Sequence, residues 1–114
     1  MTRRGAAAEA LAAEFLERRG LKILARNFRC RGGEIDLVCA DGRTLVFVEV
    51  RLRTNQNFGG AAYSITPLKQ RRLVLAARHY LARHSGAPSR FDAVLLGDLA
   101  PERIEWIRNA FDAS

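Results

Sequence analysis

Three acidic side chains and one arginine stand at alternate positions on two neighbouring segments of the chain. Glu34 and Asp36 lie on the first segment, and Glu49 and Arg51 lie on the second. Successive side chains of a β-strand point to opposite faces of a sheet, so each pair occupies a single face. Protein-bound Mg²⁺ is typically held by one or two carboxylates together with water and phosphate oxygens. The pattern is therefore one that could support metal-assisted chemistry on phosphate groups.

The turn between these segments sets how the acidic side chains meet. Asp41-Gly42 between alternating runs is a strong β-hairpin signal. With these two residues as the loop, Glu34 lies directly opposite Glu49, and Asp36 is a diagonal neighbour of Glu49 at about 7–8 Å between backbones. A four-residue loop keeps the same register. Like charges directly opposite are destabilising, so a positive group is expected between them.

Two interpretations of this acidic face remain open. In the first, Asp36 and Glu49 hold a hard divalent cation, because oxygen ligands suit such ions. In the second, the face is an exposed part of the sheet whose acids are neutralised by Arg31, Arg51 or Arg53. Spacing alone does not choose between a metal site and a solvated acidic face.

The elements that must position these residues follow from periodicity and turn signals. Helix formers at helical spacing alternate with β-rich runs, and Thr66-Pro67 is a helix-start signal. This order predicts an α/β (α+β) fold, with a mixed β-sheet flanked by helices, in a single domain over residues 1–114. The predicted elements are a helix at 5–19, strands at 21–30, 34–39 and 44–52, a helix from 67 to about 84, and strands at 90–96 and 104–108.

The other face of the predicted hairpin is uniformly apolar, and we expect it to form core. Burial of such a face against a helix is the usual way in which a sheet of this kind is stabilised. The residues of this face are Ile35, Leu37, Val46, Val48, Val50 and Leu52.

Positive charge is concentrated in one part of the chain. The formal net charge is +7, and no acidic residue occurs between Glu49 and Asp92. A basic block favours a polyanionic partner, because phosphate contacts and counterion release supply most non-specific affinity for nucleic acids. A solvated basic surface without a partner is the plainer alternative. The candidate nucleic-acid contacts are Lys69, Arg71, Arg72, Arg78 and Arg53, with a polar loop at 54–64 beside them.

Several other classes of protein are not supported. No apolar stretch approaches the roughly 20 residues of a membrane helix, and no secretory leader is evident. Cys30 and Cys39 match neither a CxxC motif nor a disulfide framework. We therefore expect a cytoplasmic protein with free thiols and no membrane partner.

The chain resembles the YraN-like family of small bacterial proteins over nearly its whole length. No single motif carries the resemblance, which depends on their combination. These motifs are Gly33-Glu34-Ile35-Asp36-Leu37, Phe47-Val48-Glu49-Val50-Arg51, the Gly5-x-x-x-Glu9 helix, Asn27-Phe28-Arg29, Lys69-x-x-Arg72-Leu73, Arg90-Phe91-Asp92 and Trp106.

That family is grouped with the restriction-endonuclease-like superfamily and is similar to archaeal Holliday-junction resolvases. The resemblance implies a mixed sheet flanked by helices and a catalytic set of Glu9, Asp36, Glu49 and Arg51. It further implies that Asp36 and Glu49 bind Mg²⁺ or Mn²⁺, with the Val50 carbonyl as an additional ligand. Glu9 would support the metal or orient water.

One position departs from the superfamily pattern. Arg51 stands where the Glu-x-Lys motif has lysine, and arginine cannot lose its proton to help activate water. Arg51 can still bind a phosphate through two parallel hydrogen bonds. Three hypotheses follow: a metal-dependent endonuclease for branched or structured DNA, a non-catalytic nucleic-acid-binding module with a degenerate nuclease site, or an accessory protein with a protein partner. A homodimer would help to cut two strands, but only by analogy.

Overall fold

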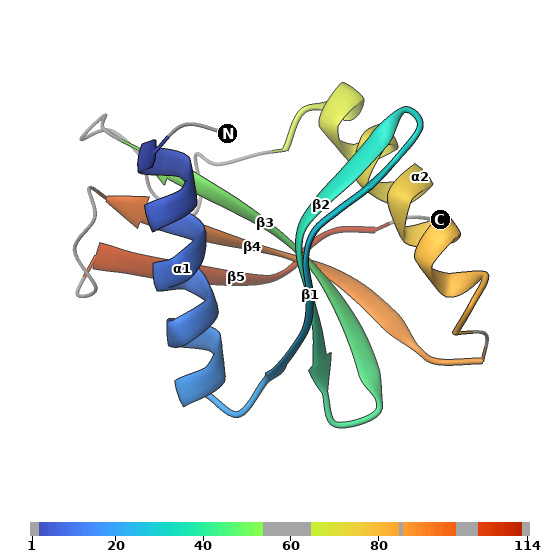
Figure 1. Cartoon of the computed structure of the whole chain (residues 1–114), viewed down its shortest axis with the longest axis horizontal. Helices are drawn as coiled ribbons and strands as arrows, with labels where there is room; N and C mark the ends of the chain where they lie inside the picture. Colours follow the sequence, from blue (N-terminus) through green and yellow to red (C-terminus); the bar gives the residue numbers. More distant parts are fainter. Residues whose placement is uncertain (1–2, 54–64, 85, 98–102, 113–114) are drawn as a thin grey trace.

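A computed structural model describes residues 3–53, 65–84, 86–97 and 103–112. Within these ranges the chain forms a five-stranded mixed sheet flanked by two helices, an α+β fold (Figure 1). This confirms the predicted sheet and its flanking helices, whereas the predicted loop at 54–64 lies outside the described residues. The elements are α1 (Arg3–Arg18), β1 (Lys22–Cys30), β2 (Gly33–Asp41), β3 (Thr44–Arg53), α2 (Pro67–Leu81), β4 (Ser89–Gly97) and β5 (Ile104–Phe111).

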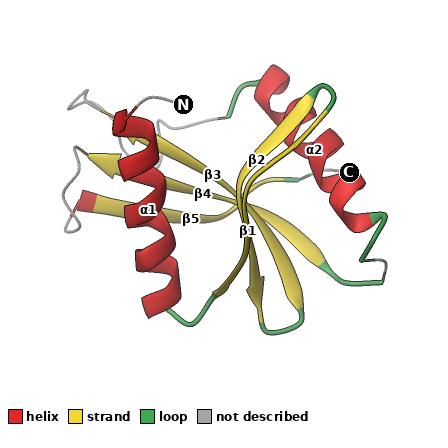
Figure 2. Ribbon diagram, viewed as in Figure 1, coloured by secondary structure: helices red, strands yellow, loops and turns green. Residues whose placement is uncertain are grey.

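The strands lie in the sheet in the same order as in the sequence, β1 to β5. All neighbours are antiparallel except β3 and β4, which are parallel. Parallel neighbours need a crossover connection, and α2 lies in the segment between β3 and β4. Figure 2 shows α1 beside β3, β4 and β5, and α2 on the far side of the β1–β2 hairpin.

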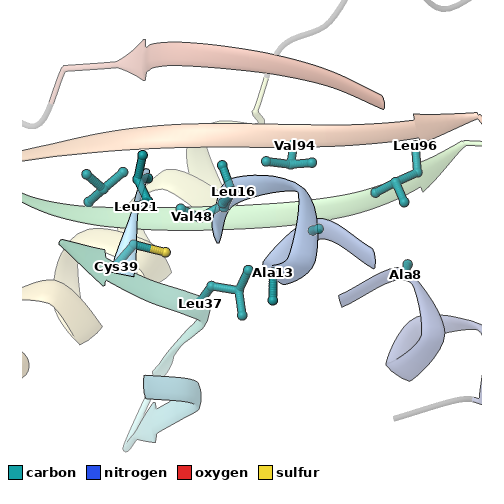
Figure 3. Close-up of a cluster of buried hydrophobic side chains, with 11 residues drawn as sticks. Ala8, Ala13, Leu16, Leu21, Leu37, Cys39, Val48, Val94 and Leu96 are labelled. Atoms are coloured by element: carbon teal, nitrogen blue, oxygen red, sulfur yellow. The ribbon is translucent and has the colours of Figure 1, made fainter. Parts of the chain in front are cut away.

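Small residues seat α1 closely against one face of the sheet. Ala8, Ala12 and Leu16 follow one another at four-residue spacing and are at most 2% exposed. Figure 3 shows Ala8 and Leu16 of this stripe of α1 beside apolar side chains of β2, β3 and β4. Alanine allows a helix backbone to approach the sheet, so residues beside this stripe can also come close to the strands.

The opposite face of the sheet is covered by α2. The Thr66 hydroxyl accepts a hydrogen bond from the Lys69 backbone N–H at 3.2 Å, and Pro67 occupies the first turn. The buried residues of the helix are Leu73, Ala76 and Ala77. The helix ends at Leu81 rather than near residue 84, because the backbone continues there in tighter three-residue turns.

The predicted hairpin register is wrong by two positions. Asp41 and Thr44 form the last pair of the ladder, and the turn consists of Gly42 and Arg43. Gly42 has a φ of +61°, which glycine adopts without the penalty that other residues incur. The faces of the strands are unchanged, because a shift of two residues preserves the alternation of side chains.

The corrected register changes which acidic residues are neighbours. Glu34 does not lie opposite Glu49. It pairs instead with Arg29 of β1, and their side chains form an ion pair at 3.7 Å. The regular β2–β3 ladder ends at the pair Leu37–Val48, one position before Asp36 and Glu49 would face each other.

Ile35 is the exception to the predicted apolar face. It packs in the cluster under α2, whereas the other five predicted residues belong to the cluster under α1. Ile35 pairs with Phe28 of β1, and the adjacent Asn27 has a φ of +51°. A left-handed residue interrupts the regular alternation of a strand, so this part of the sheet turns Ile35 to the α2 side.

Candidate active site

Asp36 is anchored beside Glu49 by a backbone hydrogen bond. The Val50 N–H donates to Asp36 Oδ2 at 2.8 Å, close to the point where the regular β2–β3 ladder ends. Asp36 is partly buried, and Glu49 is only 2% exposed. The structure therefore brings Asp36 and Glu49 together. The backbone N–H of Val50 holds the Asp36 carboxylate in this position.

The environment of Asp36 disfavours its negative charge. Burial raises the pKa of the Asp36 carboxyl, and the nearby charges of Glu49 and Glu34 raise it further. The hydrogen bond from Val50 and the charge of Lys69 act in the opposite direction. A carboxylate kept in such surroundings gains from an added cation, because opposite charge stabilises the ionised form.

Glu9 of α1 reaches the same group of carboxylates from the other helix. It is buried, and burial together with the charge of Asp36 raises the pKa of its carboxyl. A hydrogen bond from the Asn27 side chain and the charge of Arg29 lower that pKa. The structure thus places Glu9 within electrostatic range of Asp36.

Two cations hold the Glu49 carboxylate. Lys69 Nζ lies 3.2 Å from Glu49 Oε1, and Arg51 Nη2 lies 3.4 Å from Glu49 Oε2. Arg51 is one of the neutralising arginines that the sequence suggested. Lys69 was assigned to the nucleic-acid surface, and the sequence contains no local signal for its contact with Glu49, because that contact depends on how α2 docks onto the sheet.

The acidic and basic side chains enclose a small pocket. Its volume is about 10 Å³, roughly the space that one water molecule occupies. A larger cavity of about 200 Å³ adjoins it, since Glu34 and Arg72 line both, and Arg29 also lines the second. The residues that line the small pocket are Glu34, Asp36, Glu49, Lys69, Arg72 and Leu73.

The predicted basic residues of α2 line two different pockets. Lys69 and Arg72 line the carboxylate pocket, whereas Arg71 and Arg78 line a separate groove on α2. The Arg53 side chain lies outside the described residues. Arg90, which belongs to the basic part of the sequence, is largely buried and forms ion pairs with two aspartates.

The donor set of the pocket fits a hard divalent cation bound through two carboxylates. Among the residues that the structure describes, no three His, Cys, Asp or Glu side chains form a group that could hold a metal. Mg²⁺ does not need such a group, because it retains water and phosphate oxygens beside one or two carboxylates. Burial raises the pKa of the Asp36 carboxyl, so a bound cation would stabilise its ionised form.

Gly33→Ala is expected to destabilise the fold by about 1–3 kcal/mol, the usual cost of overpacking. A Cβ atom at Gly33 would lie 2.5 Å from the Arg72 carbonyl oxygen and 3.0 Å from the Ala76 nitrogen, so the α2 backbone would have to move. The measurement is urea denaturation. Gly20→Ala is the control, because its Cβ meets nothing within 4 Å and only its φ of +95° is unfavourable. A smaller loss for Gly33→Ala than for Gly20→Ala would contradict close packing at this point.

Comparison with known proteins assigns the chain to a family. Residues 8–96 match the family described as "Uncharacterised protein family UPF0102". The chain belongs to the UPF0102 family. Glu9, Asp36, Glu49 and Lys69 all lie within the matched residues, and the YraN-like assignment made from the sequence agrees with this membership.

Relatives in this family cover nearly the whole chain. A UPF0102 protein of Methylobacillus flagellatus is 54% identical over 113 residues, which span 99% of this chain and 100% of the relative. A UPF0102 protein of Nitrosomonas europaea is 56% identical, with 97% and 95% covered. One of Cupriavidus taiwanensis is 60% identical, with 96% and 83% covered.

Neither described helix of this UPF0102 chain has the length and apolar character that crossing a bilayer requires.

Proposed function

We propose that this UPF0102 protein is a metal-dependent endonuclease that hydrolyses phosphodiester bonds in branched or structured DNA. The observation that carries the proposal is the pocket in which the carboxylates of Asp36 and Glu49 meet the ammonium of Lys69. Acidic ligands beside fixed cations are what hydrolysis of a charged phosphate diester requires, because the metal and the cations both stabilise negative charge.

The metal would be held by Asp36 and Glu49, with the Val50 carbonyl as the further ligand that the family resemblance implies. When bound, Mg²⁺ or Mn²⁺ would polarise the scissile phosphate and lower the pKa of a water molecule. The raised pKa values of Asp36 and Glu9, caused mainly by burial and increased by neighbouring carboxylates, support this assignment, because a bound cation would stabilise their ionised forms.

The protein side chains would bind and orient the substrate. The Arg51 side chain is 41% exposed and can present its guanidinium to a phosphate through two parallel hydrogen bonds. Arg72 and Arg29 line the adjoining cavity, where they can contact neighbouring phosphates. Glu9 lies close enough to influence Asp36 and would orient water. The choice of branched DNA rests on the resemblance to Holliday-junction resolvases.

The test is cleavage of an end-labelled four-way DNA junction, with a linear duplex of the same sequence beside it. We expect cleavage with millimolar Mg²⁺ or Mn²⁺, none with EDTA, and preference for the junction. Glu49→Gln should lower the rate by about 10³-fold, in the range seen when a group that stabilises transition-state charge is removed. Glu17→Gln, an exposed position on α1, is the matched control and should cleave normally.

Absence of cleavage by the wild-type protein with both metals, or full activity in Glu49→Gln, would contradict the proposal.

A second candidate function is a nucleic-acid-binding module with a degenerate nuclease site. It is favoured by one observation, namely that Glu49 already has two cations on its oxygens. This candidate predicts binding that weakens steeply with salt, as expected when counterions are released. EDTA and Glu49→Gln would leave that binding unchanged, and no strand would be cut.

A further inference from the structure

The lysine that the superfamily motif carries two residues after its glutamate is absent from β3, but a lysine reaches that glutamate from α2. Lys69 Nζ lies 3.2 Å from Glu49 Oε1. Its side chain is 38% exposed, so the ammonium contacts Glu49 and still has access to solvent. The Glu49 carboxylate is therefore paired with a lysine that lies on α2 instead of β3.

Lys69 is presented by a part of α2 that is firmly positioned. Its backbone N–H donates to the Thr66 hydroxyl at 3.2 Å, and Gln70 Nε2 donates to the carbonyl of the buried Ile65 at 2.8 Å. The close contact of Gly33 with α2 one to two turns further along restrains the helix against the sheet. A lysine on such an element is directed to one place, as a group that acts on a substrate must be.

The two cations on Glu49 differ in their access to the carboxylate pocket. Lys69 lines this pocket together with Asp36 and Glu49, whereas Arg51 does not. An ammonium is a compact point charge, and a guanidinium is a broad planar group. Lys69 therefore borders the space of about 10 Å³ between the carboxylates. The charge of Lys69 also acts on Asp36, so it influences both carboxylates.

We propose that Lys69 takes the place of the missing motif lysine. Its ammonium holds Glu49 in the pocket, stabilises negative charge on the scissile phosphate, and competes with the divalent cation for the carboxylates. Arg51 is left to bind the phosphate from outside the pocket. This inference rests on the proposed nuclease function for its first readout but not for its second.

The first readout is junction cleavage by the full-length variants. Lys69→Met should lower the rate by about 10²–10³-fold, the cost of removing one group that stabilises transition-state charge. Lys69→Arg should retain more activity than Lys69→Met, because the charge is kept. The double variant Lys69→Met with Arg51→Lys should recover at least about tenfold over Lys69→Met, since a lysine returns to Glu49.

The matched control is Lys22→Met. Lys22 is the other lysine of the sequence and is exposed on β1. It should cleave at the wild-type rate. The inference would be overturned if the wild-type protein cleaves the junction and Lys69→Met cleaves it at a rate within about twofold of wild type. The proposed function would still stand in that case.

The second readout is the affinity for Mn²⁺, measured by isothermal titration calorimetry without DNA. Lys69→Met should bind Mn²⁺ several-fold more tightly than wild type, because one competing positive charge has been removed, and Lys22→Met should not. This measurement tests the inference even if the wild-type protein cleaves no DNA. Tighter Mn²⁺ binding by Lys69→Met would then show that Lys69 competes with the metal at a site that has no nuclease activity.

Unchanged affinity, or no Mn²⁺ binding by any variant, would overturn the inference. Thermal melting checks that each variant folds, and Lys69→Gln replaces Lys69→Met if the latter does not.

Discussion

Asp36→Asn is expected to abolish cleavage and, at the same time, to stabilise the fold at neutral pH. The loss of activity, about 10³-fold, follows from removal of a charged metal ligand and matches the effect of losing one transition-state contact. The gain in stability follows from the cost of burying the charge, which raises the pKa of this carboxyl. Asparagine keeps an oxygen that can accept the 2.8 Å hydrogen bond from Val50.

The stability difference should depend on pH in a defined direction. The pKa of Asp36 is raised in the folded state, so its ionised form costs stability above that pKa. As the pH falls through the folded pKa toward the unfolded value of about 3.9, protonation removes this cost from the wild-type protein. The advantage of Asp36→Asn at neutral pH should therefore shrink in acid.

Urea denaturation in EDTA at about pH 7 and about pH 4 checks this expectation. Glu9→Gln should shift stability in the same direction, because burial also raises the pKa of Glu9. The control is Asp41→Asn, a half-exposed carboxylate in an ion pair with Arg90, which should not gain stability. A destabilised Asp36→Asn at neutral pH would show that its charge is favourable in the metal-free protein.

Asp92→Ala is expected to destabilise the fold by about 3–5 kcal/mol, the range for removing one partner of a buried ion pair. Asp92 is 1% exposed and accepts hydrogen bonds from three groups. Arg90 Nε lies 3.1 Å from both of its oxygens, Trp106 Nε1 lies 3.0 Å from Oδ2, and the Asn109 N–H lies 3.0 Å from Oδ1.

The position of Asp92 explains why so many donors converge on it. The β4–β5 register shifts between Phe91 and Ala93, and Asn109 on β5 has a φ of +52°. Such an irregularity leaves a backbone N–H without a ladder partner, and Asp92 accepts from it. Alanine would leave this N–H, the indole N–H and the Arg90 Nε–H without their Asp92 acceptor, and each loss carries a desolvation cost.

Denaturant unfolding of both proteins measures the effect. A change in the midpoint denaturant concentration, at a constant slope of free energy against denaturant, reports a change in stability. Asp41→Ala is the matched control, because Asp41 pairs with the same Arg90 at 3.1 Å but is 36% exposed. A partly exposed ion pair contributes at most about 1 kcal/mol. Asp92→Ala losses no larger than those of Asp41→Ala would show that the buried network is not a main support of the fold.

The local sequence pattern was sufficient to predict the helices and strands and part of the candidate site. Helical spacing of alanine and leucine predicted α1, and Thr66-Pro67 predicted the start of α2 at Pro67. Strand alternation set the faces of Glu49 and Phe47 even though the turn was misplaced, because a shift of two residues leaves faces unchanged. The turn itself was missed, since Asp-Gly and Gly-Arg both satisfy a tight turn locally and only pairing along the strands selects one.

The errors cluster where the chain leaves regular geometry. Ile35 changed faces beside Asn27, whose left-handed backbone has no clear signal in a single sequence. Arg90 belonged to the basic part of the sequence, yet it faces two aspartates because β4 buries its side chain. Charge counts along a sequence carry no information on burial, so they could not separate Arg90 from Arg72.

The sequence by itself determined the element order, the mixed sheet with its flanking helices, and the presence of Asp36 and Glu49 on adjacent strands. Only the tertiary structure decided that Lys69 contacts Glu49 and that Glu9 approaches Asp36. The physical reason is that helix docking depends on contacts between residues far apart in sequence. Gly33 against the α2 backbone positions Lys69 at the carboxylate pocket, and the alanine stripe of α1 against the sheet holds Glu9 within electrostatic range of Asp36.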